Sequence, residues 1–397
     1  MNISVLTNVF FPVTNGVVHS VHLISRGLKE LEKDVIVISS KHPSFNHDIV
    51  QKYRINYKLI KLKSIYFPKV DYCIPNPFTL RDEIRRTNLR PDIIQVNHPF
   101  VIYKLSRIMK EYNPKSKVVF IYHTQYEQYY HYFKLIPKFI YERFLYKHLD
   151  EIFSFVDAVI FPSLSVKKSV QKNFEKYGDK FVFISNPVDL EHMEKYDEEK
   201  VNRLKVENDL KNKFVLGFVG RLEKEKNLYK LLNLFREVIN FFKERNLDNI
   251  RLILVGGGSE YSNLVNYARF LDLQKYVIFT GKISYDDIPN YYRLIDVFIT
   301  VSLTEVKPLS YLESLSVGAP IIALKTFGAD DLILDGHNGF LIEHNDDYKK
   351  NFILKIFELY KNRDLLEKMK KNAYLSSLNY NYLKISTNYL DIYKSLI

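Results

Sequence analysis

Short apolar runs alternate with helix-like stretches along almost the whole chain, and this alternation restricts the fold more than any other feature. In the first half, apolar runs predict strands at 2–8, 34–39, 92–97, 117–122, 158–162 and 181–185. In the second half, they predict strands at 214–219, 251–256, 276–280, 297–302, 320–324 and 339–342. Short apolar strands separated by helices are typical of parallel sheets covered on both faces. The sequence therefore predicts two doubly wound α/β domains.

The two series of strands are separated by residues 186–212, which are polar, charged and only weakly periodic. Such a segment is typical of a link between domains, and a chain of 397 residues is long enough for two of them. We place the first domain at 1–186 and the second at 187–375, and we expect a helical tail at 376–397.

Several predicted strands end in residues that suit a phosphate-containing ligand, and ligands of doubly wound sheets bind at the carboxyl ends of the strands. Gly16 follows the first strand at the start of a helix, where backbone can approach an anion closely, although a plain turn also uses glycine. Arg221 and Lys226 follow a later strand and suit a diphosphate, because arginine contacts two oxygens while lysine acts as a point charge. Gly257 is the middle one of three glycines at the next strand end, which leaves room for a nucleotide against the backbone.

The segment 302–320 carries the sharpest pattern. Glu305 lies on the loop after a strand, and Pro308 fits the first helical position, where its missing N–H is not needed. The free N–H groups that follow it point toward the same space. Glu313 lies further along the helix, where a carboxylate is suited to hold a diol such as ribose. Taken alone, the two glutamates would fit an ordinary surface helix.

Two histidines follow adjacent strands of the first half. His98 ends one strand, and His123 opens an aromatic loop at 123–132 that includes Tyr126. A single loop histidine is more often a surface residue than a catalyst, but two at neighbouring strand ends form a candidate site. We expect no metal site, and the single cysteine, Cys73, excludes a cysteine-based zinc site.

The positive charge of the chain is concentrated in one region. Residues 51–150 hold 19 Lys and Arg against 8 Asp and Glu, whereas residues 151–397 hold 35 against 34. Such a one-sided field indicates a polyanionic partner: nucleic acid, an anionic membrane surface or an acidic substrate. Basic and aromatic residues interleave at 52–69 and at 132–149, and this mixture suits anionic lipid. The plain alternatives are a mobile basic loop and a core-packing helix with a solvated face.

Taken together and in order, these motifs resemble family 4 of the glycosyltransferases with the GT-B fold, which are retaining, nucleotide-sugar-dependent enzymes. Three elements carry this resemblance: GRLEKEKN at 220–227 for G-R-x4-K, Glu305 and Glu313 for E-x7-E, and ILDGHNGFLI at 333–342 for D-G-x-x-G-x-L. Three more are similar to the branch that glycosylates diacylglycerol: FFPVTNGVVHSV at 10–21, HPF at 98–100 and YHTQYEQYYHY at 122–132. The match spans nearly the whole chain.

The resemblance implies a role for each matching residue. Arg221 and Lys226 would bind the donor diphosphate and stabilise the leaving group, and Glu313 would hold the ribose. Glu305 would lie near the donor sugar, and His123 would reach that sugar from the first domain; with Arg221 and Lys226 they form the expected catalytic set. Further donor contacts are expected at Gly16, Gly257, Ile283, Lys307, Pro308 and Leu309, and acceptor-side contacts at His98 and Tyr126.

The chain departs from the family pattern in places. Residues 306–309 replace a glycine-rich stretch beside the donor sugar, Asn227 replaces a frequent glycine, and Asp331 lies where glutamate is common. The identity of the donor sugar is therefore open.

These observations predict a retaining, metal-independent hexosyltransferase that moves glucose or galactose from a UDP-sugar to diacylglycerol or a glycolipid, without a cofactor. The implied GT-B fold has two Rossmann-like domains facing across a cleft: 1–186 binds the acceptor and faces the membrane, 187–375 holds the donor, and 376–397 returns to the first domain. We expect a cytoplasmic protein, peripheral on the inner face of the cell membrane through its basic 51–150 region, with no nucleic-acid partner.

Three alternatives stay open. The acceptor could be a saccharide in polysaccharide or lipopolysaccharide biosynthesis, which needs no lipid-binding patch. A sugar-nucleotide epimerase can share the two-domain architecture, but E-x7-E following G-R-x4-K argues against it. The high isoelectric point also fits a nucleic-acid-binding protein, but no recognised nucleic-acid module is present.

Overall fold

Two units make up the chain in the computed structural model, which describes all residues except 69–71, 127–129, 131–136 and 304–305. Unit 1 comprises Met1–Pro187 and Tyr382–Ile397, and unit 2 comprises Val188–Asn381. Each unit has a hydrophobic core of its own.

Unit 1 is built on a parallel sheet. Its strands are β1 (Asn2–Thr7), β2 (Asp34–Ser40), β3 (Lys58–Leu62), β6 (Ile93–Val96), β7 (Lys117–Ile121), β8 (Ala158–Phe161) and β9 (Phe181–Phe183). Their order is β3-β2-β1-β6-β7-β8-β9. The helices are α1 (Gly16–Glu30), α2 (Asp48–Lys52), α3 (Leu80–Thr87), α4 (Val101–Tyr112), α5 (Lys138–Phe155), α6 (Leu164–Asn173) and α16 (Tyr382–Leu396). Every residue of β6 and β8 is buried, as expected of strands covered on both faces.

The basic segment 52–69 is folded where the structure describes it, and it is not simply a mobile loop. Strand β3 pairs in parallel with β2, and β4 (Ser64–Phe67) pairs antiparallel with β5 (Tyr72–Pro75). Strand β3 is missed when strands are predicted from runs of apolar residues, because Lys58 and Lys61 interrupt its apolar residues. Charged residues are common on an edge strand such as β3, where they discourage pairing with other chains.

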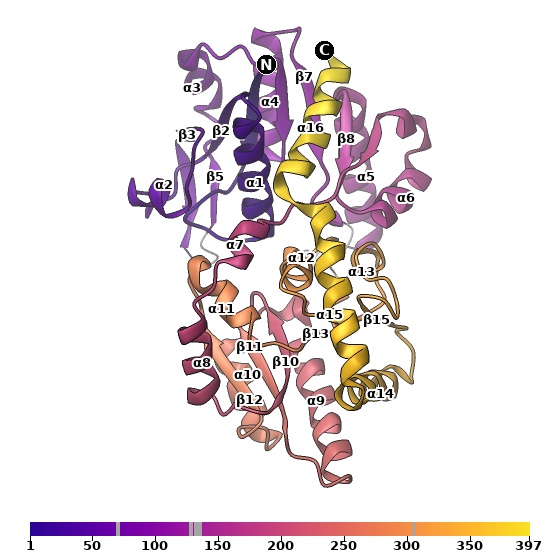
Figure 1. The fold of residues 1–397 in the computed structure, drawn as a ribbon. Coiled ribbons are helices and arrows are strands. Elements are labelled where there is room, and N and C mark those ends of the chain that lie inside the picture. The colour runs from indigo at the N-terminus through magenta and orange to yellow at the C-terminus, as the bar shows by residue number, and fades with distance from the viewer. Residues whose placement is uncertain (69–71, 127–129, 131–136, 304–305) are drawn as a thin grey trace. The chain divides into compact units, whose positions relative to one another are not determined.

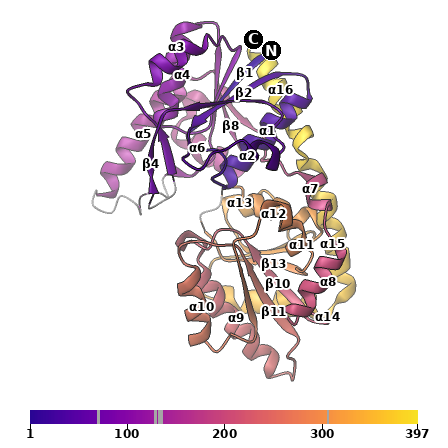
Figure 2. The ribbon, with the colours of Figure 1, turned by 90° about the vertical axis from the view of Figure 1, so that its left-hand side faces the viewer.

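The C-terminal helix α16 belongs to unit 1 and runs beside α1 (Figures 1 and 2). Gly27 allows the close approach, since a Cβ there would lie 2.3 Å from Ser386 Oγ. The Tyr382 hydroxyl donates a hydrogen bond of 2.9 Å to Glu30 on α1. Tyr389 and Tyr393 of α16 are fully buried, so the last helix completes the core of a unit whose other elements lie far away in sequence.

Unit 2 is built on a second parallel sheet. Its strands are β10 (Phe214–Val219), β11 (Ile250–Val255), β12 (Val277–Gly281), β13 (Val297–Thr300), β14 (Ile321–Leu324) and β15 (Gly339–Ile342). Their order is β12-β11-β10-β13-β14-β15. The helices are α7 (Leu190–Glu194), α8 (Glu198–Glu207), α9 (Leu228–Lys243), α10 (Tyr261–Phe270), α11 (Ile288–Tyr292), α12 (Leu309–Ser316), α13 (Phe327–Asp330), α14 (Tyr348–Lys361) and α15 (Arg363–Ser377).

The polar segment 186–212 is not an extended linker. Most of it folds into α7 and α8 of unit 2, and each helix starts at an aspartate cap. Asp189 accepts a hydrogen bond from the His192 N–H, and Asp197 accepts one from the Lys200 N–H. A polar composition can therefore reflect capped surface helices as well as a linker.

Each sheet contains one place where the strand order reverses, and loops diverge there to leave a crevice at the carboxyl ends of the strands. In unit 1 this place lies between β1 and β6, and in unit 2 between β10 and β13. Gly16 and His98 follow the first pair of strands, and Arg221 and Pro308 follow the second pair. All the predicted strands are present, so the predicted doubly wound α/β class is confirmed.

Candidate active site

The backbone at the N-terminus of α1 is exposed. Asn15 caps it, because its Oδ1 accepts a hydrogen bond of 2.9 Å from the Val18 N–H. Gly16 is exposed, and a Cβ at this position would meet no atom within 4 Å. The first turn of α1 can therefore be approached by an anion, as expected of a helix N-terminus at the carboxyl end of a strand.

His98 and His123 lie next to each other at the ends of β6 and β7. His98 Nδ1 accepts a hydrogen bond of 3.3 Å from the Asn8 N–H, and His123 Nε2 lies 2.9 Å from Asn97 Oδ1. Burial lowers the pKa of His98 to about 4. Burial, and then the electrostatic effect of His98, lowers the pKa of His123 to about 3. Both imidazoles are therefore neutral near pH 7, and they can exchange hydrogen bonds but supply no positive charge.

Tyr126 lies in an aromatic cluster and is only 8% exposed. Its ring packs edge-on against Tyr122, with ring centres 5.1 Å apart, and lies 6.5 Å from Phe100. Its carbonyl accepts a hydrogen bond of 2.6 Å from the Tyr141 hydroxyl. The side chain of Tyr126 is thus packed among the aromatic residues Tyr122 and Phe100 of unit 1.

Arg221 and Lys226 lie on the loop after β10. The exposed guanidinium of Arg221 pairs with Glu225 at 3.0 Å, and an exposed pair of this kind contributes little free energy, so that an anion can displace it. Lys226 ends a single 3₁₀ turn, and Asn227 follows it with φ +54°. Glycine and asparagine tolerate this left-handed conformation, which explains why asparagine can replace the frequent glycine.

The glycines after β11 allow two loops to touch through their backbones. A Cβ on Gly258 would lie 2.4 Å from the Leu222 carbonyl oxygen, and the Leu222 N–H donates a hydrogen bond of 2.9 Å to the Gly257 carbonyl. A Cβ on Gly257 would lie 3.3 Å from Lys282 Cβ, beside Ile283. Packing alone therefore accounts for Gly258, while Gly257 borders the turn expected to contact the nucleoside.

Glu313 is oriented by a tyrosine of α11. The Tyr292 hydroxyl donates a hydrogen bond of 2.8 Å to Glu313 Oε2. Burial raises the pKa of Glu313, and the hydrogen bond from Tyr292 opposes this effect. Pro308 occupies the N-cap position, one residue before that predicted, so α12 begins at Leu309. Glu305 lies outside the described residues.

Lys307 is buried inside unit 2, with 4% of its surface exposed. Its Nζ lies 5.0 Å from the centre of the Tyr380 ring, a cation–π arrangement. Burial lowers the pKa of Lys307 to about 8, and the charge of Asp331 opposes this effect. Two departures from the family pattern, Lys307 and Asp331, therefore interact with each other.

Known proteins resemble the chain in sequence and in fold. The family described as glycosyl transferases group 1 matches residues 200–376, and glycosyltransferase family 4 matches residues 14–192, so that together they cover most of the chain. The α-monoglucosyldiacylglycerol synthase of Acholeplasma laidlawii is 28% identical over 409 residues, which is 99% of this chain and 97% of the relative. The enzyme of the same description from Streptococcus pneumoniae is 28% identical over 347 residues, which is 86% of this chain and 75% of the relative. The Anabaena protein HepE in complex with UDP is 18% identical, with a TM-score of 0.76 and complete coverage of both chains.

The chain is a glycosyltransferase that combines a family 4 domain at 14–192 with a group 1 domain at 200–376. Its fold is the GT-B fold, as the resemblance implied. Sequence analysis misses the residues of this glycosyltransferase that contact the predicted site residues. These are Tyr292 beside Glu313, Asn97 beside His123 and Tyr380 beside Lys307. No motif contains them, and Tyr292 lies 21 residues before its partner.

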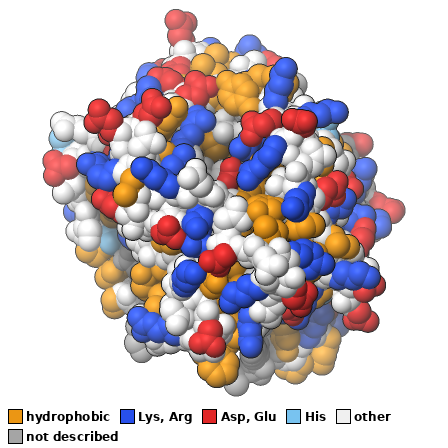
Figure 3. Space-filling model, turned by 60° about the horizontal axis from the view of Figure 1, so that its bottom comes forward, with side chains coloured by type: hydrophobic (Ala, Val, Ile, Leu, Met, Phe, Trp, Pro, Cys, Tyr) orange, Lys and Arg blue, Asp and Glu red, His pale blue; other side chains and the backbone are white. Residues whose placement is uncertain are grey.

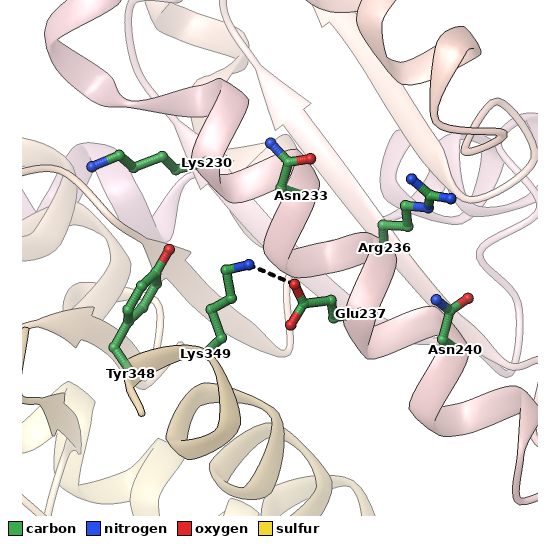
Figure 4. A pocket seen from close by; sticks show the side chains of 7 residues that line it. All are labelled: Lys230, Asn233, Arg236, Glu237, Asn240, Tyr348 and Lys349. Carbon is green, nitrogen blue, oxygen red and sulfur yellow. Dashed lines mark hydrogen bonds and ion pairs between the residues drawn. The ribbon is translucent and has the colours of Figure 1, made fainter. Parts of the chain in front are cut away.

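A further depression of the glycosyltransferase lies between α9 and α14 (Figure 4). Lys349 reaches across it from α14 to Glu237 on α9 at 2.6 Å. Its lining consists of Lys230, Asn233, Arg236, Glu237, Asn240, Tyr348 and Lys349. None of these residues follows a strand at the place where the sheet order reverses, so we assign this depression no part in the reaction.

Two features are absent from the part of the chain that the structure describes. No cluster of three or more His, Cys, Asp or Glu side chains there is arranged to hold a metal ion. No helix among the same residues has the length and apolar character needed to cross a membrane.

Proposed function

We propose that this glycosyltransferase moves glucose or galactose from a UDP-sugar to diacylglycerol or a glycolipid at a membrane surface, with retention of anomeric configuration. The proposal is supported by the two relatives described as α-monoglucosyldiacylglycerol synthases, one of which matches nearly full length. A saccharide acceptor is the second candidate, because the family and the donor residues fit it equally well.

The observation that carries the lipid acceptor is the exposed face of the first half of α5. Phe139 and Phe144 are 71% and 65% exposed, and Ile140 lies between them at 46%. Lys138 and Arg143 are exposed on the same stretch of helix. Apolar side chains surrounded by cations are what an interfacial helix presents to anionic lipid. We call the exposed side chains of residues 138–147 the lipid face of α5; they are Lys138, Phe139, Ile140, Arg143, Phe144 and Lys147.

The second half of α5 packs into the core of unit 1. Its buried residues are Leu145, Leu149, Ile152 and Phe153. The helix is thus anchored at one end while its N-terminal end exposes aromatic residues. Neither a wholly core-packed helix nor an ordinary solvated face has this distribution, since solvent-exposed phenylalanines gathered within two turns of a helix mark interaction sites.

Unit 2 differs in its surface charge. Residues 188–381, which form this unit, hold 28 basic and 29 acidic residues. Figure 3 brings forward the end of the molecule at which α9 and α14 lie, and there the two kinds of charge are interspersed. A membrane surface would therefore attract unit 1 more strongly than this part of unit 2.

The donor residues suggest how the reaction proceeds without a protein nucleophile. We assign Arg221, Lys226 and the N-terminus of α12 to the diphosphate, where fixed positive charge would stabilise the departing nucleotide. We assign Glu313 to the ribose hydroxyls, and Glu305 and His123 to the donor sugar. The acceptor oxygen would attack from the side of the leaving group, whose phosphate takes the proton.

The test is transfer of labelled sugar from UDP-glucose and UDP-galactose, separately, to diacylglycerol in liposomes with and without anionic lipid. A variant of Lys138, Arg143 and Lys147 to glutamine should weaken liposome binding by up to about a hundredfold, since each cation contributes roughly 1 kcal/mol. Its matched control replaces Lys167, Lys168 and Lys172 of α6, which changes the net charge of unit 1 equally.

The outcomes separate the candidates. A labelled lipid product that requires anionic lipid, with loss in the α5 variant alone, supports the proposal. Transfer to a saccharide but not to lipid would replace the acceptor by the second candidate. Equal losses in both variants would show that net charge matters and the lipid face does not. Absence of UDP-sugar binding would remove the assigned donor site.

A further inference from the structure

A chain of hydrogen bonds connects His123 to the C-terminal helix. His123 Nε2 lies 2.9 Å from Asn97 Oδ1, and Gln95 Nε2 donates to the same oxygen at 3.0 Å. The Tyr393 hydroxyl of α16 donates to Gln95 Oε1 at 2.6 Å, across 298 residues of sequence. Gln95, Asn97 and Tyr393 are all completely buried, so water does not compete for the bonds that join these three side chains, whereas His123 is half-buried.

The position of every proton in this chain follows from one backbone carbonyl. Asn97 Nδ2 lies 3.1 Å from the Leu6 carbonyl oxygen, which can only accept a hydrogen bond. The amide nitrogen of Asn97 must therefore face Leu6, and its Oδ1 must face His123 and Gln95. Since Oδ1 only accepts, His123 must carry its proton on Nε2, which leaves Nδ1 as an acceptor.

Tyr393 closes the chain at its other end. The Gln95 side chain must direct Nε2 at Asn97, so its Oε1 faces α16 and needs a donor there. Without the Tyr393 hydroxyl, a buried carbonyl would lose its partner, and rotation of the Gln95 amide would become less costly. A rotated amide would place oxygen against Asn97 Oδ1 and would disturb the group that holds His123.

We infer that Tyr393, Gln95 and Asn97 are positioning residues that hold His123 in its Nε2–H form, so that Nδ1 accepts a hydrogen bond from a hydroxyl of the donor sugar. This inference rests on the proposed role of His123 in the reaction. It makes α16 a functional part of unit 1, because the helix supplies the donor at the end of the chain. The low pKa of His123 agrees with an imidazole that acts as a neutral acceptor.

The helix α16 offers a matched pair of variants. Tyr393→Phe removes the hydroxyl that bonds Gln95, whereas Tyr389→Phe removes an equally buried hydroxyl that has no hydrogen-bond partner among the described residues. Both changes keep the ring and delete one oxygen from the same helix. We expect Tyr393→Phe to lower kcat about tenfold with little change in KM for the donor, since a displaced catalytic group affects the transition state most. Tyr389→Phe should leave both constants unchanged.

The tautomer of His123 can be observed directly, without an activity assay. Imidazole ¹⁵N spectra of protein labelled at histidine, with the His123 signals identified by their absence in His123→Asn, report which nitrogen carries the proton. The wild type should show Nε2–H for His123 from pH 5 to pH 8, and so should Tyr389→Phe. Tyr393→Phe should show exchange between the two tautomers.

These measurements separate the inference from the proposed function. An Nδ1–H or protonated His123 in the wild type would overturn the inference, whatever the enzyme transfers. Equal kinetic effects of Tyr393→Phe and Tyr389→Phe, in parallel with equal losses of thermal stability, would also overturn it, because they would show a role in packing alone. The expected tautomers in a protein that transfers no sugar would leave the hydrogen-bond chain in place and remove the function proposed for it.

Discussion

Lys61 should make the stability of unit 1 depend on pH in a way that the sequence does not indicate. Its Nζ donates to Ser39 Oγ at 3.0 Å and to the Phe11 carbonyl at 3.5 Å, and lies 4.2 Å from the centre of the Phe45 ring. Burial lowers the pKa of Lys61 to about 7. The ammonium of one of the six basic residues of segment 52–69 therefore bonds to groups of unit 1 and is not free to contact a lipid surface.

The direction and size of the effect follow from linkage. In the unfolded chain Lys61 titrates near 10.5, so between pH 7 and pH 10.5 the unfolded state binds about one more proton than the folded state. The contribution of Lys61 to the free energy of unfolding therefore becomes more favourable as the pH rises across that window. Below pH 7 the ammonium is charged in both states, so burying it lowers the free energy of unfolding by the full amount. Lys61→Met removes the cost, and its advantage over wild type should shrink by roughly 2 kcal/mol between pH 7 and pH 9.

The measurement is urea unfolding of wild type and Lys61→Met at several pH values from 6.5 to 9.5. Loss of the bonds to Ser39 and Phe11 shifts all values equally, so the pH dependence carries the test. Lys58→Met, at an exposed position on the same strand, should run parallel to wild type. A Lys61→Met curve that also runs parallel to wild type would refute the buried ammonium.

Further predictions concern unit 2, with one control variant in unit 1. Tyr292→Phe removes the hydroxyl that orients a buried carboxylate and should weaken UDP binding about fivefold in calorimetry, in keeping with one hydrogen bond; an unchanged Kd would contradict this. Gly258→Ala would force a Cβ to 2.4 Å from a carbonyl oxygen and should lower the free energy of unfolding by roughly 1–3 kcal/mol in the urea assay. Gly16→Ala is the control: a Cβ there would meet no atom within 4 Å, so the free energy of unfolding should change by less than about 0.5 kcal/mol. Glu225→Gln removes the carboxylate that pairs with Arg221 and should tighten UDP binding by about two- to fivefold; weaker binding would mean that Glu225 supports the site.

The fold can be predicted from the sequence because parallel strands buried on both faces are continuous runs of apolar residues. The apolar runs of β10 and β15 coincide with the observed strands, residue for residue. The criterion fails where burial is one-sided or charge intervenes, as in β3. It also fails at segment 186–212, because capped surface helices and linkers share a polar composition.

The candidate site is predictable to the extent that its residues follow strands. Gly16, His98 and Arg221 lie at the carboxyl ends of strands where the sheet order reverses, as periodicity and motif spacing require. Tyr126 also follows the end of a strand, β7, yet it is buried in an aromatic cluster. Position along the chain places a side chain at the edge of a sheet, but neighbours from other elements decide whether it faces solvent.

Local patterns are thus sufficient for the two doubly wound units, for the family and for the set of candidate residues. They say nothing of the groups that set the chemical state of those residues: the Leu6 carbonyl that orients Asn97, and the Tyr393 hydroxyl that arrives from the other end of the chain. Periodicity reports burial of neighbours three or four residues apart, whereas the protonation of His123 depends on single atoms that meet only when the sheet and α16 are packed together.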